Sequence, residues 1–326
     1  MQVFYNTRLA LPWAVAKATT SAKALKAKAE QEALPSQIVP AWALVVTAAV
    51  DTQGDRLEYK AIAWGEGMEH AIIDKRILSG SPAEDAVWSA LDELHRTVRY
   101  ARADGHAAHQ VAAMFVDSGG HHTQDVYNFC RHRKHRHIYA IKGASRPGRS
   151  ILATSPSKAD VNWRGRMEKH GALVWIIGTD TAKDWIAARL LKEPGPGAAH
   201  FAADLSDDDF EQITAEYRVA RLSKGHKIVE WHKKKNQRNE GLDLYVYNLA
   251  AAHYLGLHKM REAQWAALRA KVCPPEDLVS RAERPPAPIA ATAPGVLPAA
   301  QPTTPRPAPT AAPPSPFAKP EWSSRL

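Results

Sequence analysis

Two aspartates stand where strands of a buried sheet are predicted to end. Asp51 directly follows the apolar run 42–50 (WALVVTAAV), and Asp117 closes the run 111–117 (VAAMFVD). Residues just past the carboxyl ends of neighbouring strands converge on one crevice of an α/β sheet. Two carboxylates there repel each other unless a cation lies between them, and Mg²⁺ or Mn²⁺ suits such oxygen ligands. The aspartates therefore predict a divalent-metal site at one edge of the sheet.

Further acidic groups come from the last predicted helix, which runs from about residue 240 to 256. Glu240 and Asp243 are three residues apart and therefore share one face of that helix. Three or four carboxylates around two divalent ions form a site that hydrolyses phosphodiesters. Taken alone, an aspartate after a strand is more often a turn or capping residue. When these acids are considered together with the basic charge of the chain, a catalytic role and a turn or capping role are about equally well supported.

The composition favours a polyanionic partner. The chain has 326 residues, a formal net charge of +9 and a pI near 9.5, and neutralised phosphates release counterions that drive association. A basic surface without such a partner is the alternative. The two cysteines, Cys130 and Cys273, exclude a disulfide framework and a four-cysteine zinc site. Neither a membrane-spanning apolar run nor a signal-peptide pattern is present, which predicts a cytoplasmic protein.

Composition also divides the chain into three parts. Of 23 prolines, 15 lie at or after Pro274, and a Pro/Ala-rich segment without apolar periodicity is typical of disorder. We therefore predict an N-terminal arm (1–37), a folded domain (38–260) and a C-terminal extension (261–326) that is disordered from about 274.

The order of elements within the domain predicts the fold class. Three consecutive strands (42–50, 56–64 and 70–78) precede a helix, for which Ser81 to Glu84 reads as a capping box. Then follow the strand 111–117, a helix from Thr123, strands 137–142 and 172–178, helices from Thr181 and Ser206, a strand near 226–231 and the last helix. This order predicts an α/β fold in which an antiparallel meander feeds parallel units of a mixed sheet flanked by helices, as in a ribonuclease H-like domain.

Several segments, taken in order, resemble one phage protein family. They are VTAAVDTQGDRLEYKAIAWG, IIDKRILSGSPAEDAVWSALDEL, FVDSGGHHTQDVYNFC, YAIKGAS, IIGTDTAKDWIAARL and RNEGLDLYVYNLAAAHYL. Together with FYNTRLALPW near the N-terminus, they are similar to the nuclease domain of the lambda-type (GpA) terminase large subunits, over about residues 3–257. No single short motif is diagnostic, whereas the ordered set is highly specific.

The resemblance implies a ribonuclease H-like, metal-dependent endonuclease that cuts concatemeric viral DNA during packaging. By position, Asp51 in VDTQ and Asp117 in VDSGG become metal ligands, and Asp243 in RNEGLD is the third. Glu240 is a competitor of Asp243 or an added ligand. The implied partners are double-stranded DNA, a small terminase subunit, a portal protein and a separate packaging ATPase, with no membrane.

This chain departs from the family pattern ahead of the nuclease domain, where the family carries its packaging ATPase. Only 50 residues precede Asp51, so we expect a nuclease-only gene, a split terminase or a truncated prophage remnant whose first 37 residues are what remains of the linker. The nearest P-loop-like match, Gly143 to Ser150, has Arg149 in place of lysine, contains Pro147 and precedes no predicted helix. ATP binding by this chain is therefore not expected.

Several basic side chains have a functional and a simpler interpretation. Lys142 and Lys183 could hold the scissile phosphate or stabilise its developing charge, or be solvated surface lysines. One of His121 and His122 is a candidate metal ligand or proton shuttle, although a helix start near the DNA is the simpler interpretation. The runs 131–137 (RHRKHRH) and 233–235, the latter with Arg238, are candidates for contact with the DNA backbone or for solvated surface.

Two other functions remain open. A catalytically silent remnant could still bind DNA or a portal through its basic face, although intact carboxylates at all three positions argue against decay. Another ribonuclease H-like enzyme, such as a resolvase or transposase, would carry the same acids but not the ordered family segments.

Overall fold

A mixed eight-stranded sheet forms the centre of the domain. The computed structural model describes residues 15–16, 20–161, 167–223 and 226–274. Strands β3 (Ala43–Thr52), β4 (Arg56–Gly65) and β5 (His70–Ser79) form an antiparallel meander, and β7 (Val111–Asp117), β8 (Ile138–Gly143) and β10 (Met167–Ile177) extend it in parallel from β3. β11 (Ala199–Phe201) and β9 (Ser157–Val161) complete the order β11-β5-β4-β3-β7-β8-β10-β9. This arrangement confirms the predicted ribonuclease H-like fold class.

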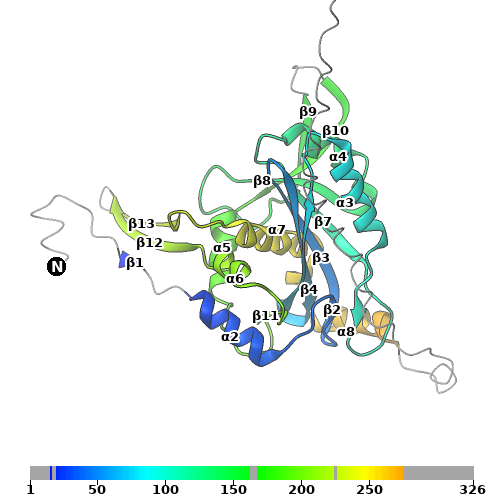
Figure 1. Cartoon of the computed structure of the whole chain (residues 1–326), viewed down its shortest axis with the longest axis vertical. Coiled ribbons are helices and arrows are strands. Elements are labelled where there is room, and N and C mark those ends of the chain that lie inside the picture. Colours follow the sequence, from blue (N-terminus) through cyan, green and yellow to red (C-terminus); the bar gives the residue numbers. More distant parts are fainter. Residues whose placement is uncertain (1–14, 17–19, 162–166, 224–225, 275–326) are drawn as a thin grey trace, which may run out of the picture. The chain divides into compact units, whose positions relative to one another are not determined.

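Side-chain alternation gives the sheet two apolar faces, each covered by helices. Ala49 and Phe115 pack in one core with α5 (Thr179–Ala187), α6 (Asp207–Ile213) and α7 (Glu240–Tyr254). Val50 and Val116 face the opposite core with α3 (Asp85–Thr97) and α4 (Thr123–Arg131). The helices accordingly lie on the two sides of the sheet (Figure 1). Because side chains alternate along a strand, the residues two beyond Ala49 and Phe115 must point to the side of α7.

Helix α7 is fixed against the sheet by a buried polar contact. The Asn248 side chain accepts a hydrogen bond from the Thr47 hydroxyl (2.8 Å) and donates one to the backbone carbonyl of Lys60 (3.1 Å). Thr47 also accepts from the Trp64 indole N–H (2.8 Å), and all these side chains are fully buried. Since leaving such groups unpaired in the core costs about 1–3 kcal/mol each, the network selects one register of α7 over β3 and β4.

Two local expectations were wrong. Helix α3 begins at Asp85, with Glu84 as a cap that makes no side-chain bond, so Ser81 does not head a capping box. Instead the Ser81 hydroxyl accepts from the Ala83 backbone N–H in a preceding turn (3.3 Å). A strand that the sequence did not predict, β12 (Glu216–Ser223), pairs with β13 (His226–Lys233) as a hairpin, which joins β1 (Val15–Ala16) outside the main sheet.

The packed domain reaches beyond residues 38–260 at both ends. Helix α2 (Ala22–Glu32), in the predicted arm, buries Leu25 and Ala29 in the core that contains α7. Helix α8 (Glu262–Val272) buries Trp265 in the same core. The short pair β2 (Ile38–Val39) and β6 (Ala101–Arg102) and three 3₁₀ turns (Glu66–Met68, Lys134–Arg136 and Leu257–Lys259) complete the elements. The predicted disordered tail lies outside the described residues, among which no helix is long and apolar enough to cross a membrane.

Candidate active site

Asp51 and Asp117 lie side by side at the ends of two parallel strands. The register pairs Val50 with Val116, so the next residue of each strand is an aspartate. The Thr52 hydroxyl donates a hydrogen bond to the backbone carbonyl of Asp117 (3.2 Å), which ties the two strand ends together. Both carboxylates point to the face covered by α7, as the alternation requires.

Burial makes this pair of carboxylates electrostatically costly. Loss of solvent and the neighbouring charge of Asp117 raise the pKa of Asp51 to about 7, and the hydrogen bond from Gln53 offsets only part of this. Burial likewise raises the pKa of Asp117, against hydrogen bonds from the Gly119 and Ser118 backbone N–H groups. Carboxylates that repel each other in a site of low polarity gain most from a cation.

Asp243 joins the pair from the first turn of α7. Burial raises its pKa to about 6, and the charges of Glu216 and Asp117 act in the same direction while Lys183 opposes them. The Lys183 ammonium lies 2.7 Å from Glu216 Oε1 and 3.5 Å from Asp243 Oδ1. The Asn239 amide donates to both Glu216 Oε1 and Asp243 Oδ2 (2.9 Å each). Glu216 is thus a fourth carboxylate of the cluster, and it is the one that sequence reasoning missed.

The charges of four carboxylates act on a single buried tyrosine. Tyr247 lies one helical turn after Asp243 on α7 and is buried. Burial raises the pKa of Tyr247 well above its usual value, and the charges of Asp117, Asp243, Asp51 and Glu216 add to the shift. The structure therefore brings together acids that are separated by up to 192 positions in the sequence, from Asp51 to Asp243.

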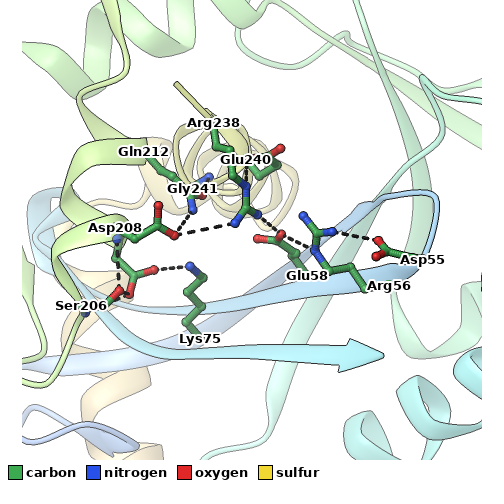
Figure 2. A network of polar contacts seen from close by, with 11 residues as sticks. Asp55, Arg56, Glu58, Lys75, Ser206, Asp208, Gln212, Arg238, Glu240 and Gly241 are labelled. Atoms are coloured by element: carbon green, nitrogen blue, oxygen red, sulfur yellow. Dashed lines mark hydrogen bonds and ion pairs between the residues drawn. The ribbon is translucent and has the colours of Figure 1, made fainter. Parts of the chain in front are cut away.

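Glu240 is engaged differently from Asp243, although both belong to the first turn of α7. Its carboxylate lies 3.2 Å from the Arg238 guanidinium, which also pairs with the fully buried Glu58 and, at 3.7 Å, with Asp208 (Figure 2). Glu240 still acts on Asp51 through its charge. Glu240 therefore pairs with Arg238, whereas Asp243 shares Lys183 and Asn239 with Glu216.

The predicted basic residues fall into two groups. Lys183 belongs to the acidic cluster, and exposed Lys142 follows Ile141, the residue that pairs with Asp117 in β8. Arg133 and Arg136 of the 131–137 run instead pair with Asp92 of α3 (2.6 Å each), which gives them a structural role.

The remaining candidates have local partners. His122 caps the start of α4 and lies 3.3 Å from Asp125, while His121 is exposed. Lys233 donates to the Asn239 side chain (3.3 Å), and Lys234 and Lys235 precede α7 without entering the acidic cluster.

The donor set of the cluster fits divalent cations. Its acidic groups offer carboxylate oxygens, which are the ligands of Mg²⁺ and Mn²⁺. Ions in a two-metal site lie about 3.5–4 Å apart, so their ligands need not converge on one point. The residues that would hold them are Asp51, Asp117 and Asp243, with Glu216 beside them.

A second group of potential ligands is less suited to a metal. Within the described ranges, only Asp104, His106 and Cys273 place ligand atoms all within 4.8 Å of one another. Both Asp104 oxygens already accept from the Arg102 guanidinium (2.9 and 2.5 Å), and burial raises the pKa of the Cys273 thiol. A neutralised carboxylate and a protonated thiol are poor ligands, so this trio is not a candidate metal centre.

Comparisons with known proteins identify the family of this chain. Residues 1–265 match the family model described as the terminase large subunit gpA, endonuclease domain. The chain is 34% identical over 262 residues to the terminase large subunit of Escherichia phage lambda, and 29% identical over 268 residues to that of Enterobacteria phage P21. Each alignment covers 77% of this chain and 38% of the relative, so the chain spans about two-fifths of their length. No solved structure matches. This chain belongs to the family of terminase large-subunit gpA endonuclease domains.

Proposed function

We propose that the protein is an endonuclease that hydrolyses double-stranded DNA with two divalent metal ions, and that it cuts concatemeric viral DNA during packaging. The observation that supports this most is the convergence of Asp51, Asp117 and Asp243 from two strands and one helix, with a raised pKa at each. Perturbed carboxylates gathered from separate elements are typical of a catalytic site. The relatives named as terminase large subunits support the biological setting.

Each residue of the cluster has a proposed task. Asp51 and Asp117 hold the ions from the sheet, and Asp243 does so from α7. The bound ions would activate water and stabilise the leaving 3′ oxygen. Lys183, which pairs with Glu216 and Asp243, would be available to the scissile phosphate if bound ions neutralised those carboxylates. Lys142 stands beside Asp117 and supports the phosphate from the other side.

The setting outside this chain follows from the relatives. We propose that the domain works in the cytoplasm of a bacterial host, with double-stranded DNA as substrate. Since the matched relatives are terminase large subunits, we propose a small terminase subunit, a portal protein and a separate packaging ATPase as partners.

Plasmid cleavage by the purified protein tests this function. Supercoiled DNA is incubated with Mg²⁺ or Mn²⁺, and with EDTA as the control. Cleavage that requires the metal is expected. If the protein binds the plasmid but leaves it intact with either metal, a DNA- or portal-binding module becomes the better account.

Helix α7 supplies a matched pair of variants. Asp243→Asn is expected to reduce cleavage more than about 100-fold, since even an outer-shell partner of a metal site contributes about 10–100-fold. Glu240→Gln is expected to change it less than about fivefold, because the Glu240 carboxylate pairs with Arg238. Initial rates at saturating metal compare the two. Equal losses would assign Glu240 to the metal as well.

Glu216→Gln tests the carboxylate that the sequence did not reveal. Glu216 is 7% exposed and positions Lys183 and, through Asn239, Asp243. We expect the Mg²⁺ concentration at half-maximal cleavage to rise about 10–100-fold, with a smaller change in the saturated rate. Glu211→Gln, on the exposed side of α6, is the control. If the Mg²⁺ concentration at half-maximal cleavage is unchanged in Glu216→Gln, Glu216 does not belong to the metal site.

A further inference from the structure

The loop that follows β8 forms a basic hollow next to the carboxylate cluster. The hollow has a volume of about 690 Å³, and its polar lining consists of Lys142, Ser145, Arg146, Arg149, Ser150 and Thr154. It includes no acidic side chain. Three cations and three hydroxyl groups around one hollow are suited to an anion with several acceptor oxygens.

The cations of this hollow are not neutralised by the protein. Lys142, Arg146 and Arg149 are exposed, and the described part of the chain provides none of them with an ion-pair partner within 4.0 Å. The nearby Asp180 carboxylate is used otherwise, since it accepts from the backbone N–H of Gly148 (2.7 Å). The positive charge is therefore available to a ligand.

The loop is held in place by its backbone. Ala144 and Ala153 donate to the carbonyls of Ile177 and Ile176 at the end of β10 (2.8 and 2.9 Å). The Thr181 hydroxyl donates to the Arg149 carbonyl (2.7 Å). Gly178 permits this approach, because a Cβ there would lie 2.6 Å from the Ser150 carbonyl oxygen. A hollow whose walls are already ordered loses little entropy when it binds a ligand.

The position of the hollow relates it to the metal site. Ile141 pairs with Asp117, and Lys142, the next residue of β8, lines the hollow. The charge of Lys142 also acts on Asp117. Neighbouring strands lie about 4.8 Å apart, and successive phosphates of one DNA strand are about 3.4 Å apart along the axis. A strand cut beside Asp117 would thus present a phosphate one or two nucleotides away to this hollow.

We propose that this hollow binds a backbone phosphate of the DNA strand that is being cut, with Arg146 and Arg149 as its principal contacts. The inference rests on the proposed endonuclease function, to which it adds the surface that places the substrate. The loop includes the P-loop-like stretch Gly143 to Ser150, but residues 151–156 form no helix, so the loop lacks the helix start that a nucleotide-binding P-loop requires. The phosphate is therefore assigned to DNA rather than to a free nucleotide.

The test is the salt dependence of DNA binding by the variant Arg146→Ala/Arg149→Ala. Binding of a fluorescent duplex is measured in EDTA, where no cutting occurs, between 50 and 200 mM salt. Each lost phosphate contact should reduce the slope of log K against log salt by about 0.9 and weaken binding about eightfold at 0.1 M salt. We expect a change in slope of about 1 to 2. Arg146→Lys/Arg149→Lys should keep most of the slope. Lys23→Ala/Lys271→Ala, which removes two exposed charges from α2 and α8, should leave it unchanged.

The outcomes separate the two proposals. An unchanged slope in the alanine variant, with the wild type cutting normally, overturns the phosphate site and leaves the endonuclease intact. A wild type that binds DNA with the expected arginine dependence but never cuts supports the site and contradicts the endonuclease. As a further comparison, ATP binding by the wild type and the alanine variant is measured over the same range of salt concentration. Binding of ATP that requires both arginines, while DNA affinity does not, would make the hollow a nucleotide site.

Discussion

Asparagine in place of Asp51 or Asp117 is expected to abolish metal-dependent cleavage. The change keeps the shape of each side chain and removes one negative charge from a pair that together would bind the cations. Since outer-shell partners alone contribute about 10–100-fold, we expect each variant to lose more than about 1000-fold in cleavage rate. Plasmid cleavage at saturating Mg²⁺ or Mn²⁺ measures the loss.

The control for the Asp51 and Asp117 variants is a change at Asp55, four residues after Asp51. Asp55 is an exposed aspartate paired with Arg56 (2.8 Å), and Asp55→Asn should cut at the wild-type rate. DNA binding in EDTA should be retained or improved in the two site variants, since each removes a charge that repels phosphate. A variant of Asp51 or Asp117 that keeps more than about a tenth of the activity would contradict the assignment of that residue.

In the metal-free protein the carboxylate cluster is expected to reduce stability as the pH rises from about 4 to 7. The effect is measured as the difference between the wild type and Asp51→Asn, because buried histidines such as His70 and His95, whose pKa values are lowered by burial, change the stability in the opposite direction. The pKa of Asp51 is raised from 3.8 to about 7 and that of Asp243 to about 6 in the folded protein. Between the unfolded and folded pKa values the native state binds more protons than the unfolded chain, so the free energy of unfolding decreases with pH. For Asp51 the shift corresponds to about 4 kcal/mol. Because the carboxylates are coupled, we expect about 3–5 kcal/mol for the cluster as a whole.

Bound metal is expected to restore the stability that the carboxylate cluster costs at the upper end of this pH range. Mg²⁺ binds the ionised carboxylates, and a ligand at 100 times its dissociation constant stabilises the native state by about 2.7 kcal/mol. Urea unfolding at pH 5 and pH 8, with EDTA and with Mg²⁺, measures both effects. The stability gain of Asp51→Asn over the wild type in EDTA should be larger at pH 8 than at pH 5, and the variant should gain less from Mg²⁺. If the variant is no more stable than the wild type at pH 8 in EDTA, the cluster is not strained by its own charge.

Local patterns in the sequence predicted much of the fold. The apolar run 42–50 becomes β3 because a strand buried on both faces has no polar positions to interrupt it. Asp117 ended its strand as predicted and α7 began at Glu240, whereas β3 continues through Asp51 to Thr52. The same reasoning failed at Ser81, where the predicted cap forms a separate turn before α3. A capping motif specifies a turn, whereas the packing of Val87 and Leu91 determines where the helix begins.

The site itself was only partly visible in the sequence. The three aspartates could be proposed because each lies at a recognisable end of an element. Glu216 could not, since it begins β12, a strand whose hairpin with β13 lies outside the main sheet and follows no simple apolar pattern. Asn239 and Lys183, which join Glu216 to Asp243, are ordinary polar residues until the fold places them within 3.5 Å.

By itself, then, the sequence determined the antiparallel meander, the main helix–strand units that follow it and the three aspartates near element ends, because hydrophobic periodicity and strand ends are properties of adjacent residues. Only the tertiary structure decided which first-turn acid of α7 faces the cluster. Arg238 pairs with Glu240 in a network that includes the buried Glu58 of β4 (Figure 2), while Asp243 lies beside Lys183 and Asn239, which also contact Glu216. That choice depends on contacts between residues 180 positions apart, and no local pattern encodes the distance between them.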